Sequence, residues 1–302
     1  MYNEDNVPKQ NGKTFFITGA NTGIGFEAAR VLAARKARVL LGCRSEVKAK
    51  DAIGRIRSIS SDADLMWVPL DLTSLESIRK AADIVQNEPR LDVLVNNAGV
   101  MIPPKETTKD GFELQFGVNH LGHFALTGML LDKLKATDSA RIVNVSSLAH
   151  KQGKIDFDDI HAQKSYDPMV RYRMSKLANM LFTFSLSSKL VNADCSVKVV
   201  ACHPGVAETE LGRFLPRWFA AVAPFIRPFF NTPAEGALPT LEATTSPQVK
   251  NCDYFGPTVR GETARGSGRA HIEDRAKNTE TADRLWAVSE SFRRSCEKYR
   301  NG

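Results

Sequence analysis

Tyr172 and Lys176 lie four positions apart in a segment whose apolar residues recur with helical spacing. On a helix this spacing puts the phenol hydroxyl and the ammonium on one face. A nearby cation stabilises phenolate, which lowers the pKa of the tyrosine toward the range useful for proton transfer. With 5 Tyr and 41 Lys plus Arg in 302 residues, chance alone supplies roughly 0.7 matches to a Tyr-x-x-x-Lys/Arg pattern. The pair is therefore a candidate acid–base site, with an ordinary surface pair as the alternative.

A glycine-rich turn follows the first apolar run of the chain. It reads Thr-Gly-Ala-Asn-Thr-Gly-Ile-Gly over residues 18–25 and leads into a helical pattern. Glycines allow a tight turn and a close approach of backbone N–H groups to a pyrophosphate, which the helix N-terminus also attracts. The spacing is G-x-x-x-G-x-G and not the commonest dinucleotide fingerprint, so a plain turn before a helix is the alternative. The candidate cofactor-binding residues of this turn are Gly19, Asn21, Thr22, Gly23, Ile24 and Gly25.

Arg44 stands at the end of the second apolar run. An NAD-selective site usually places a carboxylate there to accept from the adenosine ribose. No acidic residue is present at this strand end, and the guanidinium of Arg44 can pair with a 2′-phosphate through two parallel hydrogen bonds. We therefore expect NADP(H) as the cofactor, with an exposed strand-end arginine as the alternative.

Polar and small residues also follow the third and fourth apolar runs, and ligands bind at the carboxyl ends of strands in open α/β sheets. Asp71 either accepts from an adenine amino group or caps the helix expected from near Ser74. Asn97 and Gly99 either let the backbone lie close to the adenosine or form a turn. The candidate cofactor-binding residues at these two strand ends are Asp71, Leu72, Asn97, Ala98 and Gly99.

Short β-branched apolar runs alternate with helical patterns along most of the chain. The runs are continuously apolar, which indicates strands covered on both faces, as in a parallel sheet between two helix layers. Repeated βα units predict an α/β, doubly wound, Rossmann-type fold with helices on both faces. No linker is visible, so we expect a single domain over residues 1–302. The expected strands are Thr14–Thr18, Val39–Leu41, Leu65–Leu70, Leu91–Val95, Ile142–Val145 and Val197–Ala201.

Composition and charge are those of an ordinary globular protein, with 42% hydrophobic residues, 25% charged residues and a formal net charge of +7. The Lys and Arg residues are scattered without a zinc-finger or helix-turn-helix signature, which argues against a nucleic-acid partner. The cysteines lack C-x-x-C spacing, which favours free thiols in a reducing compartment. Neither a signal-peptide core nor a run of 18 apolar residues is visible. We expect a cytoplasmic protein.

The order of these phrases strongly resembles that of the short-chain dehydrogenase/reductase family over roughly residues 12–245. The resemblance implies a Rossmann-type oxidoreductase that uses a nicotinamide cofactor. The phrases that carry it are, in chain order, TGANTGIG, NNAG, Val118-Asn119-His120, Val145-Ser146-Ser147, YRMSK and His203-Pro204-Gly205.

The resemblance implies a catalytic tetrad of Asn119, Ser147, Tyr172 and Lys176. Tyr172 would be the general acid/base at the substrate oxygen, and Lys176 would hold the nicotinamide ribose and lower the pKa of Tyr172. Ser147 would hydrogen-bond the substrate oxygen, with Ser146 as its rival, and Asn119 would support a water that relays protons to Lys176. The residues that match the segment contacting the nicotinamide end are Pro204, Gly205 and Thr209.

The stretch between Ser147 and Tyr172 is longer than in the commonest members of that family. Its extra piece, residues 150–167, is polar, and we expect a surface excursion near the site. The piece is similar to the corresponding piece of the retinol-dehydrogenase-like branch. Members of that branch often carry an N-terminal membrane anchor. No such anchor is visible in this sequence, so we expect a soluble enzyme. The other phrases similar to that branch are GVNHLGHF at 117–124, SSLAH at 146–150, SKLAN at 175–179 and ADRLW at 282–286.

Phe214–Phe230 is aromatic and interrupted by three prolines, which a core helix would not carry. We expect it to form a lid over the substrate, spanning about residues 208–231, and a loop packed on the protein's own core is the alternative. Trp218 and its neighbours could also contact a membrane surface peripherally through residues 214–230.

His120 and His123 lie three positions apart, but no pair of carboxylates with metal-ligand spacing joins them. We therefore expect both histidines to be packing residues and expect no metal site.

The leading interpretation is an NADP(H)-dependent carbonyl reductase or alcohol dehydrogenase with a lipophilic substrate, because the expected lid is aromatic. Hydride passes between nicotinamide and a carbonyl carbon while Tyr172 exchanges the proton at oxygen. Two alternatives stay open. One is a C=C reductase that resembles protochlorophyllide reductases, and the other is a non-catalytic NADP(H)-binding regulator. The sequence does not predict an oligomeric state.

Overall fold

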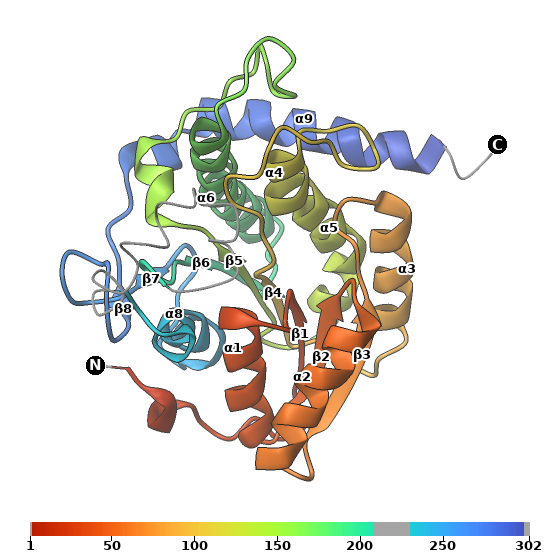
Figure 1. Ribbon diagram of the computed structural model, residues 1–302, viewed down its shortest axis with the longest axis vertical. Helices are drawn as coiled ribbons and strands as arrows, with labels where there is room; N and C mark the ends of the chain where they lie inside the picture. The colour runs from red at the N-terminus through yellow and green to blue at the C-terminus, as the bar shows by residue number, and fades with distance from the viewer. Residues whose placement is uncertain (1, 208–229, 299–302) are drawn as a thin grey trace.

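The computed structural model describes residues 2–207 and 230–298, with backbone alone for 295–298. Its centre is an eight-stranded sheet in the order β3-β2-β1-β4-β5-β6-β7-β8 (Figure 1). All neighbours pair in parallel except β7 and β8, which are antiparallel. The predicted doubly wound α/β fold is confirmed, and each predicted strand is present with its ends shifted by at most two residues. The strands are β1 Thr14–Thr18, β2 Arg38–Cys43, β3 Asp64–Pro69, β4 Val93–Asn96, β5 Arg141–Val145, β6 Lys198–Cys202, β7 Tyr254–Gly256 and β8 Gly268–Arg269.

Helices cover both faces of the sheet, and each layer buries its own apolar core. One core joins α1, α2 and α8 to the sheet, and the other joins α3, α5, α6 and α9. The central strands are therefore buried on both faces, as their continuous apolarity predicts. The helices are α1 Gly23–Ala34, α2 Glu46–Ile59, α3 Leu75–Gln86, α4 Leu114–Phe116, α5 Gly122–Lys135, α6 Pro168–Asn192, α8 Pro233–Thr245 and α9 Thr279–Lys298, with short helical turns η1 Glu4–Asn6, η2 Gly117–Leu121, η3 Leu148–Gln152 and η6 Asp274–Lys277.

The start of α6 is fixed by its own sequence. Asp167 is the N-cap and accepts a hydrogen bond from the Val170 backbone N–H at 2.8 Å. Pro168 occupies the first helical turn, where its missing N–H leaves no bond unmade. Tyr172 therefore lies just over one turn into the helix, and Lys176 lies one turn further along the same face.

Residues 150–167 are only partly at the surface. Asp159 and Arg171 form a buried ion pair at 2.8 Å, with side chains 6% and 3% exposed. The Asp159 carboxylate also accepts the backbone N–H groups of Gln163, Lys164 and Ser165. A buried charge is tolerated when it is paired and hydrogen-bonded in this way. The polar composition therefore reflects a folded loop that is anchored to α6 beside Tyr172.

Of the segment predicted to be a lid, about residues 208–231, residues 208–229 lie outside the described residues, and Thr209 is among them. The chain is described up to Ala207 and again from Phe230, and Ala207 pairs with Asn231 in an isolated parallel bridge. Asn231 is 1% exposed; its side chain donates to the Pro204 carbonyl at 2.9 Å and accepts from the Arg265 N–H at 2.7 Å. The described ends of this segment are therefore held together beside Pro204 and Gly205.

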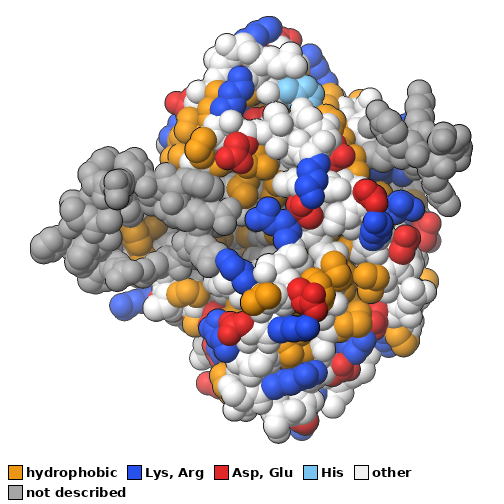
Figure 2. Space-filling model, turned by 45° about the vertical axis from the view of Figure 1, so that its right-hand side comes forward, with side chains coloured by type: hydrophobic (Ala, Val, Ile, Leu, Met, Phe, Trp, Pro, Cys, Tyr) orange, Lys and Arg blue, Asp and Glu red, His pale blue; other side chains and the backbone are white. Residues whose placement is uncertain are grey.

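The charged surface is mixed. On the face shown in Figure 2, Lys and Arg side chains are interspersed with Asp and Glu side chains and do not form one continuous patch. Within residues 2–207 and 230–298, no helix is long and apolar enough to cross a membrane.

Candidate active site

The turn between β1 and α1 has the backbone geometry of an anion site. Gly19 and Gly23 have positive φ angles of 68° and 58°, a region that side-chain-bearing residues rarely adopt. The N-cap of α1 is Thr22, and its side chain makes no capping hydrogen bond. The first N–H groups of this 12-residue helix are therefore left for another acceptor.

The turns after β1 and β4 pack directly against each other. The Asn97 side chain donates to the Thr18 carbonyl at 2.7 Å. A Cβ at Gly25 would lie 2.5 Å from Asn97 Nδ2 and 2.5 Å from the Gly19 oxygen, and a Cβ at Gly19 would lie 3.0 Å from Ala98 Cα. Close packing therefore requires glycine at both positions, and no side chain from either position blocks the approach to the turn.

Arg44 follows β2 directly and is exposed. Among the described residues, its guanidinium has no hydrogen-bond or salt-bridge partner, so its donors are free to bind an anion. Its position at the carboxyl end of β2 is the one that the sequence predicts.

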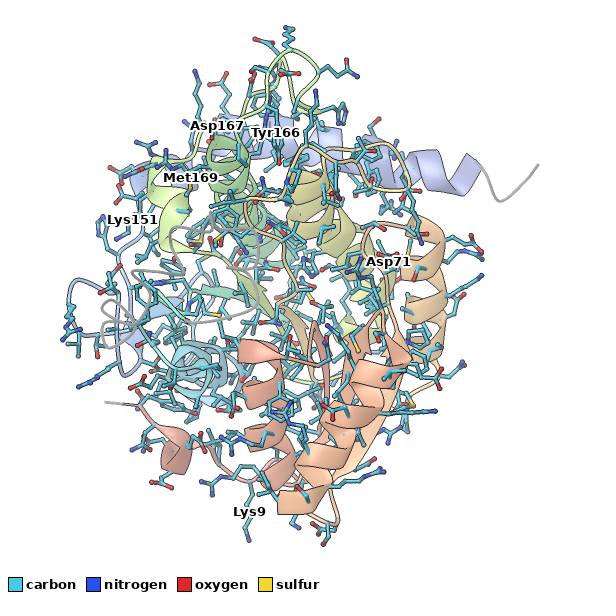
Figure 3. The ribbon with its side chains drawn as sticks, in the orientation of Figure 1. Lys9, Asp71, Lys151, Tyr166, Asp167 and Met169 are labelled. Atoms are coloured by element: carbon cyan, nitrogen blue, oxygen red, sulfur yellow. The ribbon has the colours of Figure 1, made fainter. Side chains whose placement is uncertain are left out.

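Asp71 lies just beyond the carboxyl end of β3, near the start of α3 (Figure 3). Its carboxylate accepts from the Thr73 N–H at 3.0 Å and the Thr73 hydroxyl at 2.8 Å, and it pairs with Lys109 at 3.0 Å. Burial alone would raise the pKa of Asp71, but these bonds lower it overall. Ser74 is the N-cap of α3, so the alternative in which Asp71 caps this helix is wrong. Leu72 is buried, with its carbonyl 2.9 Å from the Cβ position of Gly122.

Pro204 and Gly205 follow β6. Gly205 has a φ of 71°, and a Cβ there would lie 2.4 Å from the Thr263 carbonyl. The Val206 N–H donates to that same carbonyl at 2.9 Å. The loop between β7 and β8 therefore packs against Gly205 and Val206. No residue spacing in the sequence indicates this contact.

The four predicted catalytic residues come together at the carboxyl ends of β4, β5 and β6. Tyr172 is 6% exposed, and the Ser147 side chain lies close enough to the Tyr172 hydroxyl to lower its pKa. Lys176 Nζ lies 5.7 Å from the centre of the Tyr172 ring and donates to the Val145 carbonyl at 3.1 Å. The Cβ position of Gly99 lies 3.2 Å from Asn119 Oδ1 and 3.7 Å from Lys176 Nζ, so Asn119 and Lys176 adjoin at this point.

The structure separates the two neighbouring serines. Ser146 is 2% exposed and donates to the Lys176 carbonyl at 2.9 Å. Ser147 is half-buried, caps η3 by accepting from the Ala149 N–H at 3.2 Å, and contacts Tyr172. Ser147 therefore lies with the Tyr172 hydroxyl, and Ser146 fastens β5 to α6.

Burial dominates the electrostatics of the pair on α6. It raises the pKa of Tyr172 to about 12, and the hydrogen bond with Ser147 opposes this shift. Burial lowers the pKa of Lys176 to about 8, with Cys202 acting in the opposite direction. The spacing of Tyr172 and Lys176 predicts a lowered pKa for the tyrosine. In the structure the pKa of Tyr172 is raised instead, because burial disfavours the phenolate. Tyr172 is therefore protonated over the neutral pH range.

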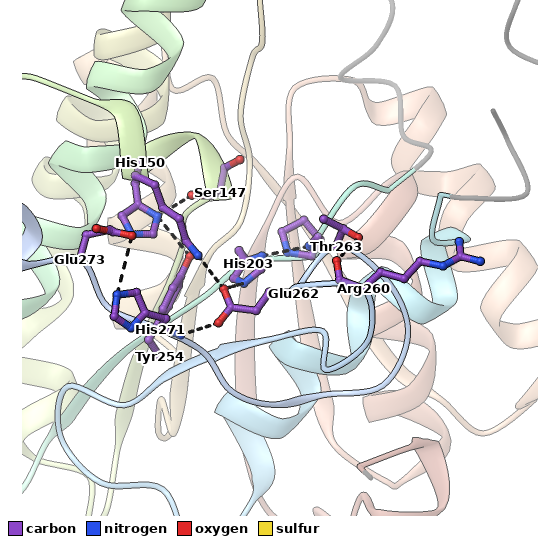
Figure 4. Close-up of polar contacts among 12 residues, drawn as sticks. Ser147, His150, His203, Tyr254, Arg260, Glu262, Thr263, His271 and Glu273 are labelled. Carbon is purple, nitrogen blue, oxygen red and sulfur yellow. Dashed lines mark hydrogen bonds and ion pairs between the residues drawn. The ribbon is translucent and has the colours of Figure 1, made fainter.

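A polar network behind Ser147 was not predicted from the sequence (Figure 4). His150 Nδ1 donates to the Ser147 carbonyl at 2.7 Å, and the Lys151 ammonium pairs with Glu262 at 2.9 Å. His203, fully buried, accepts the Gly205 N–H on Nδ1 at 3.1 Å. The phrases SSLAH and His-Pro-Gly contain some of its residues, but the sequence does not indicate that Glu262 meets Lys151, 111 residues away.

The sequence model of the family described as short chain dehydrogenase matches residues 13–218. The chain is a short-chain dehydrogenase/reductase.

This dehydrogenase/reductase lies in the retinol-dehydrogenase-like branch, as the sequence predicts. It is 44% identical to retinol dehydrogenase 13 of Mus musculus over 92% of this chain and 83% of that protein. It is 40% identical to retinol dehydrogenase 14 of Homo sapiens over 93% of this chain and 86% of that protein.

Solved structures share the fold of this chain. A protein from Mycobacterium paratuberculosis matches with a TM-score of 0.82 at 35% identity and 97% coverage of both chains. A short chain dehydrogenase of Shigella flexneri, solved in complex with NADP, matches with a TM-score of 0.64 at 25% identity, over 81% of this chain and 95% of that one. Across the described part of this dehydrogenase/reductase, no group of three or more His, Cys, Asp and Glu residues is arranged to hold a metal ion.

Proposed function

We propose that this protein is an NADP(H)-dependent oxidoreductase that transfers a hydride between nicotinamide and a lipophilic ketone, aldehyde or alcohol. The observation that carries the proposal is the group of buried Tyr172 and Lys176 with half-buried Ser147, beside a glycine turn whose helix has no side-chain cap. The names of the relatives, retinol dehydrogenases, and the NADP complex of the Shigella flexneri protein support the substrate and cofactor classes.

The residues of the turns fit a dinucleotide phosphate. The uncapped N-terminus of α1 would bind the pyrophosphate, and the glycines at 19 and 25 keep its approach open. The free guanidinium of Arg44 would bind a 2′-phosphate, and Asp71, Asn97–Gly99 and Pro204–Gly205 would line the rest of the site. When bound, the nicotinamide supplies or accepts the hydride.

Side chains of this protein transfer the proton and stabilise the charge at the substrate oxygen. Because burial keeps Tyr172 protonated, it can donate to the oxygen of a carbonyl as that oxygen gains negative charge. Ser147, whose side chain lies beside the Tyr172 hydroxyl, would donate to the same oxygen and orient it. The Lys176 ammonium then stabilises the phenolate that the proton transfer leaves behind. In the oxidative direction the same groups act in reverse.

Apolar side chains near these residues support a lipophilic substrate. Met169 and Val170, on the turn of α6 that precedes Tyr172, are 37% and 50% exposed (Figure 3). Val206, next to Gly205, is 39% exposed. Apolar surface on two elements that carry site residues favours a substrate with a hydrocarbon portion.

We also propose a cytoplasmic location. All four cysteines whose side chains are described are free thiols, which is the state that a reducing compartment maintains. Localisation of the tagged full chain by cell fractionation tests this.

Oxidation of NADPH in the presence of a panel of lipophilic aldehydes and ketones tests the proposed activity. Turnover with at least one apolar carbonyl is the expected result. Binding of NADPH without turnover across the panel would favour a cofactor-binding regulator instead.

Replacing Arg44 with Asp is expected to narrow or reverse the cofactor preference. The wild type should bind NADPH more tightly than NADH by at least about tenfold, or 1.4 kcal/mol, because the guanidinium pairs with the 2′-phosphate. In Arg44→Asp that advantage is replaced by repulsion of the phosphate. Fluorescence titration with both cofactors measures the two dissociation constants.

Arg57→Asp is the matched control, because Arg57 is an exposed residue of α2 and the substitution makes the same change in net charge. It should leave the NADPH/NADH ratio unchanged. Equal affinity of the wild type for both cofactors would contradict the assignment.

A further inference from the structure

His123 connects the helix that carries Asn119 with the turns of the cofactor site. It is the second residue of α5 and is 2% exposed. Its Nδ1 lies 3.0 Å from the main-chain oxygen of Asn119, and its Nε2 lies 2.9 Å from the Thr18 hydroxyl. Both ring nitrogens are therefore used, and each contacts a different part of the site.

The two contacts determine which nitrogen carries the proton. A carbonyl oxygen only accepts, so Nδ1 bears the hydrogen and donates to Asn119. Burial lowers the pKa of His123 to about 4; the bond to Asn119 opposes this shift, and the nearby Lys176 cation adds to it. The ring is therefore neutral at neutral pH, and Nε2 accepts a hydrogen bond from the Thr18 hydroxyl.

Thr18 extends this chain of bonds to the turn after β4. It is the last residue of β1, directly before Gly19. Its hydroxyl oxygen accepts the backbone N–H groups of Asn97 and Ala98, both at 2.9 Å. The hydroxyl hydrogen is therefore free to go to His123, at 2.9 Å, in preference to the Val95 carbonyl at 3.3 Å.

At the Asn119 end of this chain of hydrogen bonds, the Asn119 side chain already bonds to other groups. Its Nδ2 donates to the Val100 carbonyl at 2.9 Å and to the Ser175 hydroxyl at 3.0 Å, and its Oδ1 accepts the Val100 N–H at 2.8 Å. The main-chain carbonyl is the group of Asn119 that His123 holds. Asn119 lies in the π-helical turn η2, where the helical hydrogen-bond ladder is interrupted and a side-chain donor can set the orientation of a carbonyl.

We propose that His123 is a positioning residue whose two nitrogens serve separable tasks. The Nδ1–H fixes the main-chain carbonyl of Asn119, whose side chain lies with Lys176 Nζ at the Gly99 turn. The Nε2 lone pair fixes the Thr18 hydroxyl next to the turns that would hold the cofactor. The first task acts on proton transfer and the second on cofactor affinity. This inference rests on the proposed function.

Two nearly isosteric substitutions separate the tasks, because an Asn amide reaches the position of Nδ1 and a Gln amide reaches that of Nε2. His123→Asn keeps the donor to Asn119 and loses the acceptor of the Thr18 hydroxyl. It should raise the Kd for NADPH about fivefold and change kcat by less than about twofold. His123→Gln should lower kcat about tenfold and leave the Kd within about twofold of the wild type.

His120→Leu is the matched control. His120 is 1% exposed in the adjoining turn, but its Nε2 is bonded to Ser289 on α9, away from the cofactor turns. This substitution should lower the melting temperature and change neither Kd nor kcat, because the imidazole there only packs and bonds to α9.

The Kd is measured by fluorescence titration with NADPH and kcat by carbonyl reduction. Opposite effects of His123→Asn and His123→Gln support the proposal. The same change in both variants, or a loss of melting temperature alone as in His120→Leu, would overturn it. If the wild type turns over no carbonyl, the proposed function fails, but the Kd difference between the two variants still tests the contact between His123 and Thr18.

Discussion

Replacing Tyr172 with Phe is expected to lower kcat for carbonyl reduction by about 10²–10⁴-fold while the Kd for NADPH stays within about twofold. The substitution removes one hydroxyl and keeps the ring that packs in the site. That hydroxyl lies beside Ser147 and stays protonated because burial raises its pKa to about 12. Steady-state kinetics and a fluorescence titration of the same preparation measure the two quantities.

Tyr166→Phe is the control for the Tyr172 variant. Tyr166 precedes α6, and its hydroxyl donates to the Pro103 carbonyl at 2.7 Å. Its loss should leave kcat nearly unchanged. A Tyr172→Phe enzyme with a near-normal rate would show that the proton reaches the substrate by another route and would refute the proposed role of Tyr172.

Lys176→Ala is expected to impair both kcat and cofactor binding, which distinguishes it from the tyrosine variant. Lys176 is 3% exposed, lies beside the Gly99 turn and carries the cation closest to the Tyr172 ring among the described contacts. Removing it should lower kcat by about 10²-fold or more and raise the Kd for NADPH about tenfold, because the ammonium acts on Tyr172 and on the cofactor side of the site together. The same two assays measure these changes.

Lys189→Ala provides the comparison on the same helix. Lys189 lies over the Trp286 ring at 4.8 Å, far along α6 from Tyr172. It should retain both kcat and NADPH affinity. A Lys176→Ala enzyme with an unchanged Kd would contradict a role for Lys176 at the cofactor.

The parts of the fold that the sequence predicts are those with a local signal. Continuous apolar runs marked β1 to β6, and the Thr-Gly turn marked the start of α1. The Tyr172 and Lys176 pair could be assigned because both lie on one helix that begins at a recognisable cap. In contrast, β7 and β8 are three and two residues long, too short for any periodicity to mark them.

The unpredicted parts of the site depend on contacts between distant residues. Glu262 pairs with Lys151, and Asn231 holds Pro204, yet nothing in the spacing of these residues indicates that they meet. The sequence predicts His123 as a packing residue, because its bond to Thr18 forms only once β1 lies beside the start of α5. The raised pKa of Tyr172 is likewise a result of burial, which tertiary packing decides.

Single turnover with a lipophilic α,β-unsaturated aldehyde and NADPH deuterated at the transferable position of nicotinamide C4 tests the proposed carbonyl reduction. We expect an allylic alcohol with deuterium on the carbinol carbon, which the wild type forms and which Tyr172→Phe forms about 10²–10⁴-fold more slowly. Deuterium on a carbon of the former double bond would identify a C=C reductase. NADPH that binds and stays unoxidised would identify a non-catalytic binder, and either result would contradict the account.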